Sequence, residues 1–203
     1  MRERSNVIAV LNYGAGNLQS VRNTLDSIGA KYELTSSPEG LQNASKIILP
    51  GVGHFGQLTH ALDDLGVRET LLERIRSGVP FLGICLGLQA LFTASEEAPD
   101  EPGLGLFEGT VARFKGELRI PHMGWDQVEL RNSSRLLQGL NRAPYFYFAH
   151  SYYCPLVPAS AATCDYLVRY TAVIEQDNVF GVQFHPEKSG ALGQIIVRNF
   201  VEL

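Results

Sequence analysis

The sequence predicts an α/β protein built on an open, mixed, mostly parallel sheet flanked by helices, with a second half that is richer in β-strand. In the first half, short apolar runs alternate with segments whose apolar residues recur at helical spacing, as parallel strands joined by helices require. After residue 92 the runs become shorter, richer in aromatic and β-branched residues, and separated by turn residues. The chain has 203 residues, 45% of them apolar, which fits a single domain over residues 1–203 with one sizeable core.

The first half is expected to repeat a strand-turn-helix unit. Short apolar runs predict strands at residues 7–11, 32–34, 46–49 and 79–84. Apolar residues three or four apart predict helices from Leu18 to the stop at Gly29, over residues 58–65, and over residues 71–75 before the stop at Gly78. Residues 86–92 are expected to begin a further helix directly after the last of these strands. Because parallel strands end at the same edge of a sheet, the loops that follow them are expected to lie together.

The second half opens with an acidic stretch, residues 95–103, that is expected to form an exposed loop. Beyond it, aromatic and β-branched residues predict strands at residues 145–153, 166–175 and 179–184. The polar residues 176–178 between the last two runs predict a hairpin turn. A closing helix from Ser189 is expected to direct apolar side chains to the core, namely Leu192, Ile195, Ile196 and Phe200.

Composition and charge argue against several classes of function. The formal net charge is -4 and no stretch concentrates Lys and Arg, so the chain lacks the basic surface that binding to nucleic acid requires. The cysteines Cys85, Cys154 and Cys164 show no paired spacing, which argues against a disulfide framework or a structural zinc site and predicts a reducing compartment, the cytoplasm. The apolar run after the charged start, residues 1–6, is too short for a signal sequence or a membrane span.

The most informative residue is Cys85, in Gly83-Ile84-Cys85-Leu86-Gly87. It lies at the corner between an expected strand and an expected helix, the position of the nucleophile in the strand-turn-helix elbows of hydrolases. Such a corner has crowded neighbours, which explains a glycine two residues before it and another two after it. Amides at the start of the following helix favour negative charge, and therefore the thiolate that a cysteine nucleophile needs.

The candidate base for this nucleophile is His185, in His185-Pro186-Glu187. Pro186 favours an extended conformation at His185, and residues i and i+2 of an extended segment point to the same side. Glu187 is therefore expected to orient the imidazole ring and complete a Cys-His-Glu triad. Taken alone, Cys85 could be a buried structural cysteine and His185 a strand cap. Both motifs and the loop Pro50-Gly51-Val52-Gly53 follow expected strand ends, where open α/β sheets bind ligands, and this favours catalysis.

Attack on an amide carbonyl creates an oxyanion, which backbone amides stabilise. The amide of Leu86, directly after the nucleophile, is one candidate donor, and the glycine-rich backbone at Val52 is the other. The flexibility of that loop suggests that its amide turns inward only when the site is occupied. An ordinary Pro-Gly turn is the alternative interpretation of the loop.

Two of these motifs resemble the signature of the triad-type, or class I, glutamine amidotransferases: Gly83-Ile84-Cys85-Leu86-Gly87-Leu88-Gln89 and Gln183-Phe184-His185-Pro186-Glu187-Lys188-Ser189. Further segments resemble the glutaminase subunits of imidazole glycerol phosphate synthase, an enzyme of histidine biosynthesis, namely residues 13–18, 50–53, 120–125 and 148–153. The resemblance extends from about Val7 to the C-terminus. It implies a flavodoxin-like amidotransferase fold and gives no reason to expect a cofactor or a metal.

The resemblance implies that the chain hydrolyses glutamine to glutamate and ammonia. Cys85 would form a glutamyl thioester, His185 would protonate the departing ammonia and then activate water, and Glu187 would hold His185. The substrate would be bound at positions that match the family's motifs, namely Gly51, Gly53, Gln89, Ser151 and Tyr152.

The resemblance also implies a heterodimer with a (β/α)8-barrel cyclase, which receives the ammonia directly and makes imidazole glycerol phosphate and an aminoimidazole carboxamide ribonucleotide. The residues expected to face the barrel or shape the ammonia passage are Asn17, Pro121, Met123, Trp125, Tyr147 and Lys188. The alternatives are a helix cap for Asn17, a surface charge for Lys188, and core packing for Met123 and Trp125. The chain departs from the family pattern at His54, which either titrates near the loop or faces solvent, and also at Leu88 and Asp126.

Other interpretations fit less well. Gly14-Ala15-Gly16 after the first strand suggests a dinucleotide site, but Gln19 stands where that fingerprint needs Gly or Ala. A metal site from His150, Cys154 or His185 would lack paired spacing. Among glutaminases, the pyridoxal phosphate synthase type would carry Gly-Gly-Glu-Ser after its Pro. The anthranilate type usually has His before the Gln of the elbow helix, where this chain has Leu88.

Overall fold

The structure is a computed structural model that describes residues 7–15 and 17–203. The charged start, residues 1–6, and Gly16 of the Gly14-Ala15-Gly16 turn lie outside the described residues. The helical elements are α1 (Leu18–Ser27), α2 (Pro38–Asn43), α3 (Phe55–Asp64), α4 (Arg68–Arg76), α5 (Leu86–Gln89), the 3-10 turn η1 (Pro186–Lys188) and α6 (Gly190–Val201). None of the helices in the described part of the chain is long and apolar enough to cross a bilayer.

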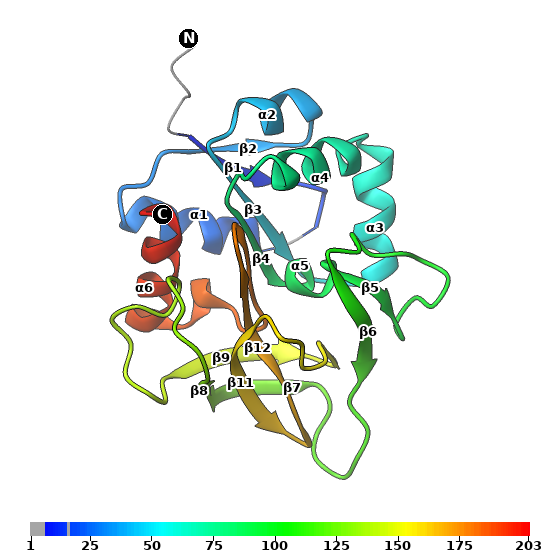
Figure 1. Ribbon diagram of the computed structural model, residues 1–203, viewed down its shortest axis with the longest axis vertical. Coiled ribbons are helices and arrows are strands. Elements are labelled where there is room, and N and C mark those ends of the chain that lie inside the picture. Colours follow the sequence, from blue (N-terminus) through cyan, green and yellow to red (C-terminus); the bar gives the residue numbers. More distant parts are fainter. Residues whose placement is uncertain (1–6, 16) are drawn as a thin grey trace.

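The strands fall into one large sheet and two small ones. They are β1 (Ile8–Leu11), β2 (Tyr32–Thr35), β3 (Lys46–Gly51), β4 (Phe81–Cys85), β5 (Phe92–Ser95), β6 (Phe107–Arg113), β7 (His122–Gln127), β8 (Glu129–Leu130), β9 (Tyr145–His150), β10 (Tyr152–Tyr153), β11 (Ser160–Tyr166), β12 (Val168–Gln176) and β13 (Val179–Val182). Within the described residues, the large sheet has the order β2-β1-β3-β4-β13-β12-β11-β8 (Figure 1).

The first five strands of that order run parallel, and their arrangement is that of flavodoxin-like folds. The other three continue the sheet by antiparallel pairing. The predicted fold class, an open, mixed, mostly parallel α/β sheet flanked by helices with a β-rich second half, is therefore confirmed. The sheet places β4 between β3 and β13, so the loops that follow these three strands meet at one edge.

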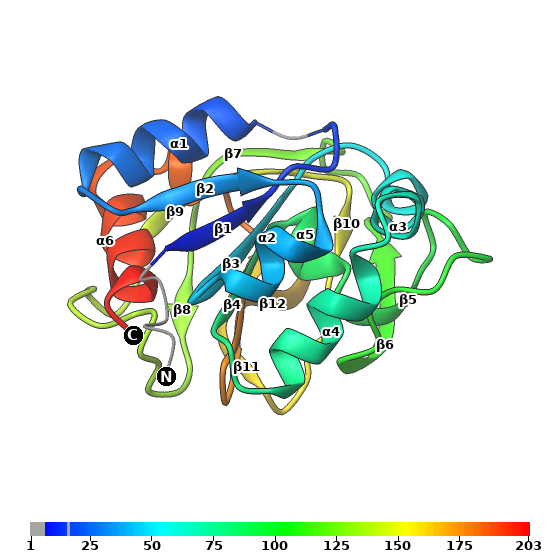
Figure 2. The ribbon, with the colours of Figure 1, turned by 90° about the horizontal axis from the view of Figure 1, so that it is seen from above.

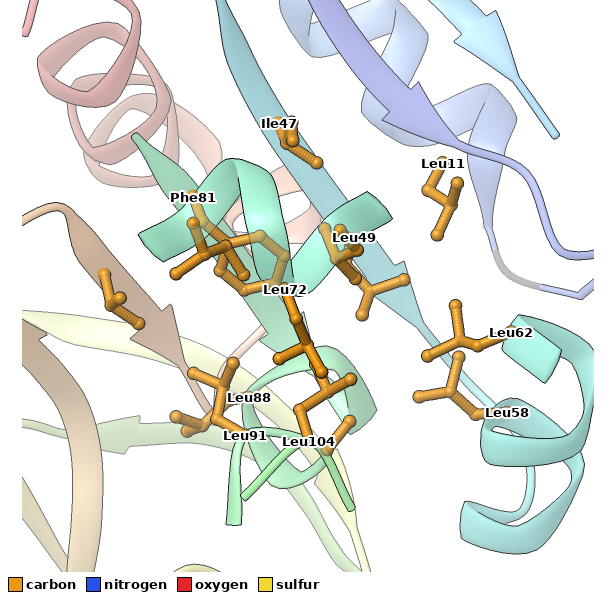
Figure 3. Close-up of a cluster of buried hydrophobic side chains, with 14 of the residues drawn as sticks. Leu11, Ile47, Leu49, Leu58, Leu62, Leu72, Phe81, Leu88, Leu91 and Leu104 are labelled. Carbon is orange, nitrogen blue, oxygen red and sulfur yellow. The ribbon is translucent and has the colours of Figure 1, made fainter. Parts of the chain in front are cut away.

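Helices cover both faces of the parallel strands because alternate residues of a strand point to opposite sides (Figure 2). On one face, Ile8 and Val10 of β1 pack in a cluster with α1 and α6. On the other face, Leu11 packs in a cluster with α3 and α4, and Figure 3 shows Leu58 and Leu62 of α3 on its side of the sheet. Burial of each such side chain contributes about 1.5–3 kcal/mol to folding, so this double-sided core holds the loops at the sheet edge in place.

The small sheets lie beyond that edge. β7 and β9 form an antiparallel ribbon, and β5, β6 and β10 form a separate sheet. The ribbon is fixed to the chain after β13 by a hydrogen bond of 2.8 Å from the amide of His185 to the carbonyl of Tyr147. The second half of the chain thus closes over the ends of the parallel strands.

Two expected elements are wrong in part. The helix expected over residues 86–92 ends at Gln89, and Phe92 begins β5. The carbonyl of Leu91 accepts the amides of Leu106 and Phe107, so pairing with distant residues replaces the helical bonds. The single strand expected over residues 166–175 is a hairpin: Tyr166 ends β11, Leu167 turns with a φ of 57°, and β12 begins at residue 168.

Two further differences come from weak local signals. The run expected at residues 145–153 is interrupted at Ser151, between β9 and β10. The short helix α2 was not expected, although Ser37 caps it by accepting a hydrogen bond from the amide of Gly40 and Pro38 begins it. The hairpin turn at residues 176–178 and the closing helix are confirmed, with Asp177 in the left-handed region.

Candidate active site

Cys85 ends β4 and immediately precedes α5, at the predicted corner. Its φ is 53°, in the left-handed region, which costs a residue other than glycine about 1–3 kcal/mol. The corner is possible because the backbones around it touch. A Cβ at Gly83 would collide with the carbonyl of Gly87, and one at Gly87 would collide with the carbonyl of Leu49. At Gly51, a Cβ would lie 2.5 Å from the amide nitrogen of Gly87, so this third glycine is also required.

His185 follows β13, the strand next to β4, and its ring reaches Cys85. Its Nδ1 lies 2.8 Å from Oε1 of Glu187, and the two side chains are 3% and 2% exposed. This leaves Nε2 for the hydrogen bond with the sulfur of Cys85. Burial would lower the pKa of His185, but the charges and hydrogen bonds of Cys85 and Glu187 outweigh burial and raise that pKa to about 10. The geometry therefore favours a protonated imidazole beside the sulfur of Cys85, the arrangement that activates a cysteine nucleophile.

The backbone conformation that brings Glu187 to the ring of His185 differs from the expected one. His185 is extended, with φ -98° and ψ 95°, as expected before a proline, but residues 186–188 form the 3-10 turn η1 instead of continuing the strand. Ser189 holds this turn, because its hydroxyl donates to the carbonyl of His185 at 2.7 Å and accepts the amide of Tyr147 at 3.0 Å. The turn, and not strand alternation, brings the carboxylate back to its neighbour.

A buried amide completes the surroundings of the sulfur. Gln183 is fully buried and donates from Nε2 to Cys85 Sγ at 3.6 Å. Its Oε1 accepts from Gln89 Nε2 at 3.2 Å and from Cys154 Sγ at 3.8 Å, which fixes which end of the amide faces Cys85. The helix α5 spans only residues 86–89, so its field on the thiolate is small. Stabilisation of the thiolate therefore falls mainly to His185 and Gln183.

A pocket of about 250 Å³ opens in front of Cys85. Most of the residues expected to bind substrate or the oxyanion line it with Cys85, namely Val52, Gly53, Leu86, Gln89, Ser151 and Tyr152. Gly51 is buried behind Gly87 and does not line the pocket. A larger and more open hollow, of about 640 Å³, lies along α1 and β2, but no cysteine or histidine lines it.

The pocket also contains residues to which the sequence analysis assigned no role in the site, Glu97, Ala149 and His150. Glu97 belongs to the acidic stretch expected to be an exposed loop, yet its Oε2 accepts the amide of Phe55 at 2.7 Å at the start of α3. Burial lowers the pKa of His150 to about 3, so its ring is neutral in the pocket wall. A carboxylate in a run of acidic residues gives no local signal of this kind of contact.

The amide of Val52, one of the two expected oxyanion donors, is engaged elsewhere. It donates to the hydroxyl of Tyr13 at 3.2 Å, and the same hydroxyl lies 3.2 Å from the carbonyl of Val52. Tyr13 is 8% exposed, and burial raises its pKa to about 12, so the hydroxyl stays neutral. The neighbouring His54 is exposed and caps α3 by accepting the amide of Gly56 at 3.1 Å, which gives this departure from the family pattern a structural role.

The residues expected at a partner surface gather on the outer face of the β7–β9 ribbon. Met123 is 55% exposed and Trp125 57%, so the alternative of core packing is wrong for both. Tyr147 contacts Trp125 edge to face at 6.3 Å, and Lys188 Nζ lies 5.8 Å from the ring centre of Tyr147. Met123 and Pro121 also line the pocket, so this surface is continuous with the site.

Asn17 stands apart from the ribbon, at the start of α1. It occupies the N-cap position but makes no capping hydrogen bond with its side chain. The alternative of a side-chain helix cap therefore has no support in its contacts.

Comparisons with known proteins agree on one family. The model of the family Glutamine amidotransferase class-I matches residues 9–203. Imidazole glycerol phosphate synthase subunit HisH of Methanothermobacter thermautotrophicus is 48% identical over 198 residues, which cover 97% of this chain and 98% of that protein. The same subunit of Thermococcus kodakarensis is 45% identical, over 97% of this chain and 100% of that protein. A crystal structure of a glutamine amidotransferase has the same fold, with a TM-score of 0.76 and 21% identity over 96% of this chain and 97% of that one.

Proposed function

This chain belongs to the class-I glutamine amidotransferases, in the branch of the HisH subunits of imidazole glycerol phosphate synthase, and we propose that Cys85, His185 and Glu187 are the triad with which it hydrolyses glutamine. The observation that carries the proposal is the strained corner at Cys85, with a buried imidazole and carboxylate behind it and an open pocket in front. The ammonia would serve histidine biosynthesis.

The triad carries out acyl transfer in two halves. The Cys85 thiolate attacks the side-chain amide carbon of glutamine, and the carbonyl electrons move to oxygen. His185 then gives its Nε2 proton to the amide nitrogen as the carbon–nitrogen bond breaks, so ammonia leaves and a glutamyl thioester remains. Neutral His185 next takes a proton from water, whose oxygen attacks the thioester. Collapse of that intermediate releases glutamate and restores the thiolate beside a protonated ring.

Glu187 determines which ring nitrogen of His185 transfers the proton. Because its carboxylate holds Nδ1 in a hydrogen bond of 2.8 Å, proton transfer is confined to Nε2, which faces the sulfur. The ring also cannot rotate away between the two halves of the reaction, since both groups are buried.

The oxyanion of each tetrahedral intermediate would be held by the amides of Leu86 and Val52. One such donor is worth about 100- to 1000-fold in rate. The Val52 amide is bound to Tyr13, so the backbone at Val52 must turn before the second donor becomes available. On this basis the isolated chain hydrolyses glutamine slowly, and an event that turns this loop accelerates it.

We further propose that the partner is the cyclase subunit, a (β/α)8 barrel, and that it covers the outer face of the β7–β9 ribbon in a heterodimer. Exposed Met and Trp side chains are typical anchors of protein interfaces, and Met123 and Trp125 are each more than half exposed here. Because Met123 and Pro121 also line the pocket, ammonia released at Cys85 would pass them on its way to the barrel. Trp125→Ala should weaken the complex by about 2 kcal/mol or more, measured by calorimetric titration with the cyclase subunit.

We place this activity in the cytoplasm. Cys85, Cys154 and Cys164 are all free thiols. A reducing compartment keeps thiols in that state, and the proposed nucleophile must be reduced to act.

A glutamine-mimicking diazoketone tests the site assignment. The reagent should alkylate Cys85 stoichiometrically, as located by peptide mass mapping. The matched variant Cys154→Ser should be labelled like the parent, and Cys85→Ser should not be labelled. An adduct on Cys154 or Cys164 with none on Cys85 would overturn the assignment.

A further inference from the structure

A second cluster of ligating side chains lies between the β7–β9 ribbon and the β11–β12 hairpin. His122 and Asp126 share one face of β7, and Gly124 between them carries no side chain, so His122 Nε2 and Asp126 Oδ2 meet at 3.1 Å. Cys164 of β11 joins them, with one ligand atom of each residue lying within 4.8 Å of the other two. A nitrogen, a carboxylate oxygen and a sulfur are the ligand types of zinc.

Behind His122 lies a buried chain of hydrogen-bonded rings. Nδ1 of His150 lies 2.8 Å from the carbonyl of Tyr152, which only accepts, so this nitrogen carries the proton. The other ring nitrogen of His150, Nε2, lies 3.3 Å from the hydroxyl of Tyr170, and the hydroxyl in turn lies 3.1 Å from Nδ1 of His122.

The Cys164 thiol takes part in the same cluster of contacts, because it hydrogen-bonds with the hydroxyl of Tyr170 and with Asp126. The three candidate ligand atoms are therefore held close together by side chains from β7 and β11, with Tyr170 of β12 behind them.

We propose that His122 Nε2, Asp126 Oδ2 and Cys164 Sγ bind a zinc ion. The thiol favours zinc over magnesium and calcium, which prefer oxygen ligands, and its proton passes to solvent on binding. The ligand atoms draw together on binding, since zinc bonds are about 2.0–2.3 Å long. Tyr170 fixes the tautomer of His122 from behind, as outer partners of metal-binding histidines do.

Of the three residues in this cluster, Asp126 is the one that contacts solvent, while His122 and Cys164 are buried. Asp126 is 32% exposed at its side chain and lines a surface hollow of about 490 Å³ together with Thr163 and Asp165. The hollow gives the ion a path of entry, and a water from it can take the fourth coordination position. The ion would brace the inner face of β7, while Met123 and Trp125 occupy the outer face of the same strand.

Cobalt(II) tests the proposal, because its thiolate complexes absorb in the near ultraviolet. The full chain is used as the Cys85→Ser variant, so that the proposed nucleophile cannot bind the probe, and it is freed of metal with a chelator and titrated with cobalt chloride. Saturation is expected at about one equivalent, with a sulfur-to-cobalt band. Adding Cys164→Ser should abolish the band, Asp126→Asn should weaken cobalt binding about tenfold or more, and Cys154→Ser should change neither.

The same variants show how the proposal fails. Failure to bind cobalt at stoichiometric protein concentration would overturn it, and so would a band that survives Cys164→Ser. Asp126→Asn keeps the shape of a partly exposed side chain, so it separates loss of a ligand from loss of the fold. If that variant is folded and binds cobalt as tightly as its parent, the site is not the one proposed. Zinc chloride should also raise the melting temperature of the parent and leave that of the Cys164→Ser variant unchanged.

Discussion

The two walls of the candidate active site differ in how closely they match the arrangement that the proposed mechanism requires. On one wall, Cys85 is held by the sheet, and the buried His185 and Glu187 stand behind it in hydrogen-bonding contact. On the other wall, the amide of Val52 is bound to Tyr13, next to the exposed Gly53 and His54. The proposed nucleophile is thus part of a rigid element, and one of the proposed oxyanion donors is part of a loop. The difference supports the proposal that the nucleophile is in place before the second oxyanion donor is, and that the isolated chain hydrolyses glutamine slowly for that reason.

The largest effect should come from removing the nucleophile. In the complex with the cyclase subunit, Cys85→Ala should reduce glutamate release by roughly 10000-fold or more, as loss of a covalent nucleophile does in other hydrolases. Cys154→Ser is the matched control, because Cys154 is also buried beside Gln183 and has no role in the mechanism. Glutamate release by Cys85→Ala within tenfold of the parent's rate would show that Cys85 is not the nucleophile.

The next effect should come from the group that orients the base. Glu187→Gln keeps the size of the side chain but removes the charge that holds the Nδ1 proton, so glutamate release should fall by about 100- to 10000-fold. The affinity of the variant for the cyclase subunit, measured by titration, should equal that of the parent, which checks that the partner surface is intact. Activity equal to that of the parent would mean that the ring is held by something other than this carboxylate.

The thermal stability of Glu187→Gln is also expected to depend on pH differently from that of the parent. His185 has a pKa of about 10 in the folded chain, above an unfolded value of about 6.5. Its interactions therefore stabilise the fold fully below pH of about 6.5, and this stabilisation is lost as the pH rises toward 10. Since Glu187 helps to raise that pKa, the loss should occur at lower pH in Glu187→Gln. Melting temperatures from pH 6 to pH 10 measure it, and identical profiles for the two proteins would contradict the assignment.

A smaller effect is expected from the amide beside the sulfur. Gln183→Glu replaces an N–H donor to Cys85 with a carboxylate, so the thiolate should lose a charge-assisted hydrogen bond. Alkylation of Cys85 by iodoacetamide at neutral pH should slow by about 10- to 100-fold. The rate for Cys164, outside this network, provides the internal control. An unchanged rate at Cys85 would show that His185 alone activates the thiol.

The smallest effect concerns the loop wall and has the opposite sign. Tyr13→Phe removes the hydroxyl that holds the amide of Val52, so this amide should turn toward the oxyanion more often. One neutral hydrogen bond of about 0.5–1.5 kcal/mol corresponds to a gain of about 2- to 12-fold in glutamine hydrolysis by the isolated chain. The complex, in which the amide is already turned, should change little. A lower rate in the isolated variant would mean that Tyr13 supports the active conformation.

Local patterns in the sequence were sufficient to predict the corner at Cys85 and the parallel strands. Apolar runs mark β1, β3 and β4 because both faces of these strands are buried, and glycine spacing marks the corner at Cys85 because backbones touch there. The contact between His185 and Glu187 was expected, but the conformation that makes it was not. A 3-10 turn held by Ser189 depends on bonds to β9, which no local pattern reveals.

Other features depend on distant parts of the chain and left no local signal. Glu97 lies in an acidic stretch that reads as solvent-exposed, yet it binds the start of α3. The engagement of Val52 with Tyr13 joins the loops after β1 and β3. The cluster of His122, Asp126 and Cys164 comes from strands of two different sheets, β7 and β11, that meet only in the folded chain, so the sequence predicted no metal there.

The most direct test of the difference between the two walls measures both of them in one sample of the isolated chain. Iodoacetamide reports on the thiolate and needs no oxyanion donor, whereas glutamine turnover needs both. The account predicts that Cys85 is alkylated much faster than Cys154 or Cys164, while glutamine turnover stays slow and rises when the cyclase subunit is added. Preferential alkylation of another cysteine, or rapid glutamine turnover by the chain alone, would contradict it.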